Sequence, residues 1–195
     1  MNTWRKKSLR SQHGAAVVET ALVFLFFFLL LCGIIEFGRA FFVWNTVQEV
    51  TRNAARSATV ADFNDAAALS RVRQTAIFRT DSGPLIVMPE ITDASILIRY
   101  LNASRTQASP SPRCQAENIR NCITDPNANN CIRFVEVTIC GAGGNNGACG
   151  NISYTPWLPI LGGAFDALTP NITIPKSRVV MPAETLGYTP GLPDC

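Results

Sequence analysis

The stretch "GAAVVETALVFLFFFLLLCGII", residues 14–35, decides the fold of this chain. The 21 residues from Ala15 to Ile35 contain a single charged side chain, that of Glu19. A helix rises about 1.5 Å per residue, so a helix of this length can cross the hydrocarbon core of a bilayer. We therefore predict a transmembrane helix over residues 15–35. The carboxylate needs an explanation, because charged groups inside a membrane are costly and usually functional.

The charges that flank this run are uneven. The first 14 residues contain no acid and four basic residues, Arg5, Lys6, Lys7 and Arg10. Basic flanks stay in the cytoplasm, which predicts a cytoplasmic N-terminus and an extracytoplasmic C-terminal body. Without these four residues the chain has 17 − 4 = 13 basic residues against 14 acidic ones. A nearly neutral body argues against nucleic-acid binding, which calls for a basic face.

The cysteines support the same orientation. Cys32 lies in the apolar run, and the other six all follow it: Cys114, Cys122, Cys131, Cys140, Cys149 and Cys195. An even set on one side of a membrane segment predicts disulfides in an oxidising compartment. Zinc fits less well, because there is no Cys-x-x-Cys pair and His13, the only histidine, precedes the run. The connectivity stays open, although Cys140 and Cys149 flank "GAGGNNGA", a glycine-rich loop that favours this pair.

Three processing fates compete at the apolar run. A secretory signal peptide needs a small-x-small site after the run, and "EFGRAFFVWN" (36–45) offers only a poor one. A lipoprotein signal would modify Cys32, but the residue before it, Leu31, is large. Cleavage before the run, between Gly14 and Ala15, fits best. It would retain the helix and make Glu19 the fifth residue of the mature chain.

The N-terminal pattern resembles a known family. A basic leader, a glycine, a small residue, an early glutamate and an apolar helix resemble the class III signal of type IV pilins and pseudopilins. More specifically, "GAAVVETALV" (14–23), "GIIEFGRAFFVWN" (33–45) and "TRNAARSAT" (51–59) resemble the TadE-like family, the minor pseudopilins of the tight-adherence (Tad, Flp pilus) system. The resemblance covers about residues 14–60. Major Flp pilins usually have Tyr where this chain has Thr20, which favours a minor pseudopilin.

The resemblance implies a processing step and partners. In the family, an inner-membrane prepilin peptidase cleaves after the glycine, here Gly14, and the equivalent acid is Glu19. Other implied partners are further Tad pilus subunits, the inner-membrane assembly platform and membrane lipid, in a system involved in adhesion. Cleavage would create an amine on Ala15, which could pair with the Glu19 carboxylate of a neighbouring subunit and favour a defined stagger. The alternative is that Glu19 snorkels to the membrane surface.

The sequence predicts an α+β fold, and the resemblance implies a type IV pilin-like architecture. It combines a long N-terminal helix, a second short helix, and a small antiparallel sheet with disulfide-held loops. We divide the chain into a basic leader (1–14), a transmembrane helix (15–35), its extracytoplasmic continuation (36–62) and a disulfide-rich domain (63–195). The continuation carries apolar or small residues at three- and four-residue steps: Phe37, Ala40, Phe41, Trp44, Val47, Thr51, Ala54 and Ala58. Glu36 and Arg39, three residues apart, are expected to pair.

The rest of the chain predicts one helix and several strands. Residues 64–79 are amphipathic, with Asn64 as N-cap and a buried side made of Leu69, Val72, Ala76 and Ile77. Strands are predicted in 95–101 and 132–139, where apolar residues alternate, and in the segments 151–158 and 171–181. Residues 102–131 are expected to be irregular and held by disulfides.

No pattern predicts catalysis or a cofactor. Cleavage would remove His13, and "GAGGNNG" lacks the lysine and hydroxyl of a phosphate-binding loop. Asp125, Asn127 and Asn129 have the spacing of a calcium loop but lack its later glutamate, so turn formation is the better interpretation. We therefore predict a non-enzymatic minor pseudopilin without metal. The alternative is a monomeric, single-pass, membrane-anchored binding module that keeps its N-terminus.

Overall fold

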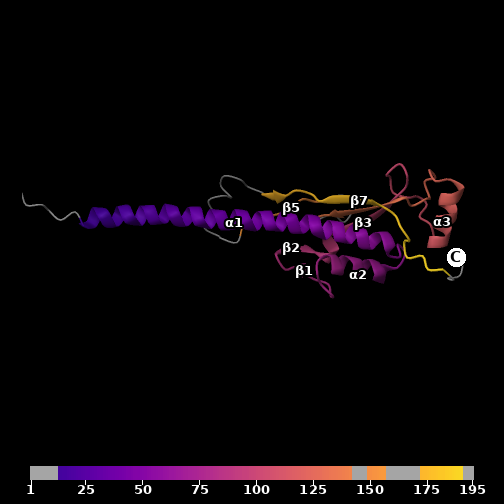
Figure 1. Ribbon diagram of the computed structural model, residues 1–195, viewed down its shortest axis with the longest axis horizontal. Coiled ribbons are helices and arrows are strands. Elements are labelled where there is room, and N and C mark those ends of the chain that lie inside the picture. The colour runs from indigo at the N-terminus through magenta and orange to yellow at the C-terminus, as the bar shows by residue number, and fades with distance from the viewer. Residues whose placement is uncertain (1–12, 142–148, 157–171, 191–195) are drawn as a thin grey trace, which may run out of the picture.

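A computed structural model describes residues 13–141, 149–156 and 172–190 of the chain. One helix, α1 (His13–Val60), dominates the molecule. Figure 1 shows that every other element gathers around the C-terminal half of α1, while the N-terminal half extends alone to one side. The elongated shape thus follows from one helix that is much longer than the domain it supports.

The described elements confirm the predicted α+β class. After α1, the chain forms α2 (Ala66–Ala76), β1 (Pro84–Leu85), β2 (Met88–Thr92), the 3-10 turn η1 (Asp93–Ser95), β3 (Ile96–Leu101), α3 (Gln115–Thr124), β4 (Phe134–Ile139), β5 (Ile152–Ser153), β6 (Thr173–Ile174) and β7 (Arg178–Pro182). The strands form a three-stranded sheet in the order β3-β4-β7 and two small pairs, β1-β2 and β5-β6. All of these pairings are antiparallel.

The core lies between α1 and one face of the three-stranded sheet. On the central strand β4, Val135, Val137 and Ile139 alternate toward α1 and are completely buried. This matches the alternation expected of a strand with one face on the core. Register with the neighbours is regular: Val137 lies opposite Ile98 of β3 and Val179 of β7.

The C-terminal half of α1 supplies the other side of the core. From Val43 onward, one face of the helix is buried, and its members are Val43, Val47, Val50, Thr51, Ala54, Ala55, Ala58 and Thr59. The three alanines are completely buried, as expected of small residues that let a helix approach a sheet closely. The first part of the predicted stripe behaves differently, because Phe37, Phe41 and Trp44 are exposed. Complete burial against the chain's own domain therefore begins at Val43, whereas Glu36, Arg39 and Ala40 before it are only partly buried.

The end of α1 is closed by the C-terminal segment. The Thr59 carbonyl accepts backbone hydrogen bonds from Glu184 and Leu186, at 3.3 and 3.0 Å. Such bonds satisfy a carbonyl that has no partner within the last turn of a helix. Gly187 has φ +83°, and a Cβ there would lie 2.8 Å from the Cα of Asp62. The close crossing of two chain segments requires glycine at this position.

Helix α2 is shorter than predicted and begins at a different cap. Asp65, and not Asn64, is the N-cap, and its carboxylate accepts the Ala67 N–H at 2.8 Å. The Asn64 side chain instead donates to the Arg113 carbonyl at 2.6 Å. The predicted buried side is largely present, because Val72, Ala76 and Ile77 are buried while Leu69 is only partly covered.

The last predicted strand segment is divided in the structure. The described part of this segment, from residue 172 on, forms two strands, β6 and β7, on either side of an interruption at 175–177, whereas residue 171 lies outside the described residues. Pro175 lacks the N–H that a continuous ladder would use, so the chain leaves one pairing and joins another. The β1-β2 hairpin is a further element that the sequence did not predict, because its two strands are short.

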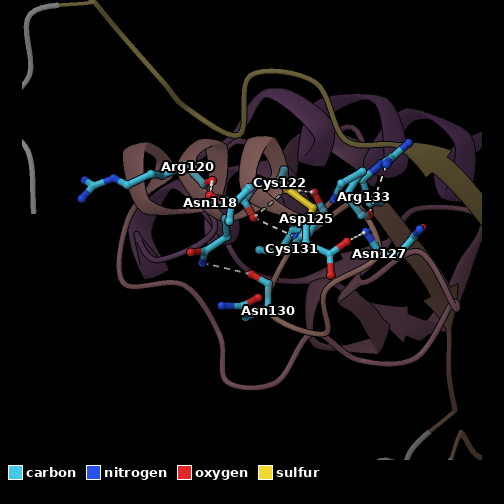
Figure 2. Close-up of a disulfide and its surroundings, with 12 residues drawn as sticks. Asn118, Arg120, Cys122, Asp125, Asn127, Asn130, Cys131 and Arg133 are labelled. Carbon is cyan, nitrogen blue, oxygen red and sulfur yellow. Dashed lines mark hydrogen bonds between the residues drawn. A yellow bond between two sulfur atoms is a disulfide. The ribbon is translucent and has the colours of Figure 1, made fainter.

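The prediction that residues 102–131 are irregular is wrong for helix α3. Figure 2 shows how this helix is fastened: the Cys122–Cys131 disulfide links it to the segment that leads into β4. Beside the disulfide, the buried Asn118 side chain accepts the Ile132 N–H at 2.8 Å and donates to the Ile132 carbonyl at 3.4 Å. The Asn118 amide thus bonds both the N–H and the carbonyl of Ile132, as the backbone of a neighbouring strand would.

Two predictions for the cysteine-rich region are confirmed, a disulfide across the glycine-rich loop and a turn at Asp125. The Cys140–Cys149 disulfide, the pair favoured by the glycine-rich loop, is present. Cys114 is disulfide-bonded as well, whereas Cys195 lies outside the described residues. The Asp125 carboxylate accepts the Asn127 N–H at 2.9 Å, which is the turn chemistry expected of this segment (Figure 2).

Ala54→Leu is expected to lower the free energy of unfolding by about 1–3 kcal/mol, because extra volume at a completely buried position forces the sheet away from α1. Denaturant unfolding of the detergent-solubilised protein measures this. Val60→Leu, at a position 47% exposed on the same helix, is the control. Equal stability of the Ala54→Leu variant and the wild-type protein would contradict the close packing.

Candidate functional site

The predicted site residues lie at the beginning of α1. Gly14, Ala15 and Glu19 are all exposed on the first turns of this helix. Ala15 and Glu19 are four residues apart and therefore share one face. Within the described part of the chain, the Glu19 carboxylate makes no hydrogen bond or ion pair. The structure thus places these residues together, on a surface that the described part of the chain leaves open.

The apolar half of α1 has no cover from the described domain. Its side chains are exposed throughout Val17–Leu31, including Phe24, Phe26, Phe27 and Phe28, each more than half accessible. By length and composition α1 can cross a membrane, and its most apolar window is entirely unburied within the molecule. The core helix of a soluble protein would instead be mostly buried. So large an apolar surface calls for a lipid or protein environment.

A polar junction marks the place where the apolar run ends. Glu36 and Arg39 form the predicted ion pair, with 3.0 Å between Arg39 Nη1 and Glu36 Oε1. Tyr154, which follows β5, joins them: its hydroxyl donates to Glu36 Oε1 at 2.5 Å and accepts from Arg39 Nη1 at 3.2 Å. Arg39 also donates to the Thr155 carbonyl at 3.1 Å and lies 5.1 Å from the centre of the Tyr154 ring. The ion pair therefore holds the end of β5, and with it the β5-β6 strand pair, on α1.

The environment of Tyr154 explains its protonation. Burial raises the pKa of Tyr154 to about 12, and the hydrogen bond to Glu36 adds to this effect, while the charge of Arg39 opposes it. The hydroxyl therefore stays protonated at physiological pH and remains a donor. As a result, the Glu36 carboxylate, which is mostly shielded from water, keeps two partners at the junction.

The sequence predicted the Glu36–Arg39 pair but not its third member. Tyr154 is more than a hundred residues away, in a segment recognised only as a candidate strand. Nothing in its local pattern distinguishes it from a tyrosine that packs in a core. Among the described residues, no group of three or more His, Cys, Asp or Glu side chains is placed to hold a metal ion.

Among the residues that the structure describes, the fold and this surface define a protein with one N-terminal helix suited to anchor it in a membrane, followed by an α+β domain. A family model described as TadE-like protein matches residues 14–56. The matched segment lies within α1 and includes Gly14, Glu19, Glu36 and Arg39, which confirms the resemblance found in the sequence. No curated protein and no solved structure matches the chain.

The family match supports a component associated with the Tad pilus. It covers 43 of the 195 residues, so it concerns the N-terminal helix and not the domain that follows. The family is one of structural pilus components. The uncovered helix surface and the family match thus point to the same part of the molecule, the N-terminal half of α1.

Tyr154→Phe removes a partly buried hydrogen bond to a charged group, so it is expected to lower the free energy of unfolding by about 1.5–3 kcal/mol. The benzene ring still packs, so the loss reports the hydroxyl alone. Tyr188→Phe is the control, because it removes a hydroxyl from a tyrosine that is 41% exposed. Chemical denaturation in detergent measures both variants, and equal stability of Tyr154→Phe and the wild-type protein would contradict the junction.

Proposed function

We propose that the chain is a minor pseudopilin, a structural and assembly component of a Tad pilus, which a prepilin peptidase processes after Gly14. The observation that carries this proposal is the apolar half of α1, which begins at Gly14 and is uncovered by the described domain. A helix of this kind lodges first in the membrane and then packs among other subunits of a filament. The match of residues 14–56 to the TadE-like family supports it.

The position of Glu19 gives the proposal its chemistry. Cleavage between Gly14 and Ala15 leaves an ammonium group on Ala15, close to the membrane interface. A carboxylate and an ammonium attract strongly where the dielectric constant is low, and pairing offsets much of their desolvation cost. Glu19 is exposed on α1, which suits a partner on a neighbouring subunit. The pair then fixes the axial stagger between the two helices.

The proposed topology follows from the charges. The basic residues before Gly14 remain in the cytoplasm, the helix spans the bacterial inner membrane once, and the disulfide-bonded domain lies outside. The proposed partners are the prepilin peptidase, other pilus subunits, the inner-membrane assembly platform and membrane lipid. The pilus system that these partners form acts in adhesion.

Processing is tested by N-terminal sequencing of the membrane-extracted protein, with and without a co-expressed prepilin peptidase. The proposal predicts that the mature chain begins at Ala15 only when the peptidase is present. A leader that is intact under both conditions would contradict the proposal and favour a monomeric, membrane-anchored binding module.

Glu19→Ala is expected to leave membrane insertion intact, because it makes the span more apolar, and to reduce co-purification with other pilus subunits several-fold. Membrane fractionation and pull-down of a tagged chain measure the two effects separately. Glu49→Ala is the matched control, since it removes an exposed acid from the same helix beyond the apolar run. Unchanged association of the Glu19→Ala chain would exclude the proposed pairing.

A further inference from the structure

The face of the three-stranded sheet that points away from α1 has a hollow of about 420 Å³. Its walls come from β3, β4 and the start of β7, together with residues 105–107 and the nearby Cys149 and Lys176. The volume is in the range of sites that hold small molecules or a few units of a polymer. This hollow belongs neither to the α1 surface nor to the junction at Tyr154.

The charge in this hollow is one-sided. Four basic side chains line it, those of Arg99, Arg105, Lys176 and Arg178, and Glu136 is the only acid among the lining residues. Glu136 is 5% exposed and pairs with Arg178 from the adjacent strand. Three positive charges are therefore in excess here, although the chain after residue 14 as a whole has 13 basic and 14 acidic residues. Like charges gathered in a concave surface raise the local potential and attract anions.

Contacts with the protein hold the basic groups in place. Lys176 Nζ donates to the Cys149 carbonyl at 2.8 Å, next to the Cys140–Cys149 disulfide. The Arg105 guanidinium lies 5.9 Å from the centre of the Phe134 ring. Positions fixed in this way lower the entropic cost of binding an anion. Most of these groups remain open to solvent, because Arg105, Lys176 and Arg178 are exposed.

The neutral lining indicates the chemistry of the ligand. Thr106 and Gln107 are exposed hydrogen-bonding side chains, and Leu97 and Leu101 supply an aliphatic surface. Guanidinium groups bind carboxylates through paired hydrogen bonds. A ligand that carries carboxylates, hydroxyl groups and apolar ring faces matches all three features. Sugars with carboxylate groups have this combination.

Two other anionic partners, a lipid membrane and a nucleic acid, fit the hollow less well. A second, smaller hollow places Lys176 and Arg178 beside Gln48 and Arg52 of α1. Gln48 lies 13 residues past Ile35, about 20 Å farther along the helix, which is beyond the lipid headgroups. Nucleic acids require stacking surfaces or a long basic stripe. None of the described residues that line the hollow is aromatic, so it offers no ring on which a base could stack.

We propose that this hollow, named the basic hollow, binds an acidic saccharide whose carboxylates pair with Arg99, Arg105, Lys176 and Arg178. The proposal depends on the domain alone and does not require processing at Gly14. It gives the extracytoplasmic part of the chain a ligand of defined chemistry.

Calorimetry with the full chain in a non-ionic detergent tests the proposal. The probes are a short oligogalacturonate, its methyl ester and a glutamate peptide of equal charge. The oligogalacturonate is expected to bind in a salt-dependent manner, and more tightly than the peptide. The ester is expected not to bind, because it keeps the sugar but lacks the charge. No binding of the oligogalacturonate, or equal binding of the ester, would overturn the proposal. Equal binding of the peptide would overturn the saccharide assignment.

Variants locate the binding. Arg105→Gln and Lys176→Gln are each expected to weaken binding about ten-fold, because each removes a charged hydrogen bond. Glu136→Gln removes the only acid of the basic hollow and is expected to strengthen binding several-fold. Arg71→Gln, on α2, loses the same charge elsewhere and is expected to change nothing. Unchanged affinity in both Arg105→Gln and Lys176→Gln, or an equal loss in Arg71→Gln, would contradict the basic hollow as the site.

Discussion

The structure depends on the contrast between the two halves of α1. From Val43 to Thr59 one face of the helix is buried by the sheet and α2, whereas from Val17 to Leu31 the side chains are exposed all round. A surface as apolar as the first half is stable only in lipid or against other proteins. The helix is continuous, so the domain is attached directly to a segment that needs such an environment (Figure 1).

In the region between the two halves, polar side chains of α1 bind the domain. The side chains of Glu36 and Arg39 project from α1 at the end of the apolar run and bind Tyr154 next to the β5-β6 strand pair. This junction brings the domain close to the start of the exposed surface. If Glu19 sets an axial stagger as proposed, the continuous helix α1 connects that contact directly to the domain.

Local patterns predicted the parts of the fold that depend on local interactions. The long helix, the alternation of β4 and the Cys140–Cys149 pair follow from residues that are close in sequence. Helix α3 was missed because its polar residues gain stability from the disulfide and from Asn118, which pairs with Ile132 across a turn. Tyr154 and the basic hollow were missed because their members come from distant segments, which only the folded chain brings together.

Depth measurement in a bilayer tests the central claim about α1 most directly. Spin labels at Phe26 and at Glu49, introduced singly in a Cys32→Ser chain in lipid nanodiscs, report collisions with oxygen or with a polar nickel complex. The account predicts oxygen access at position 26 and nickel access at position 49, because these positions lie in the uncovered apolar half and on the exposed face of the domain-bearing half. Nickel access at both positions would contradict it.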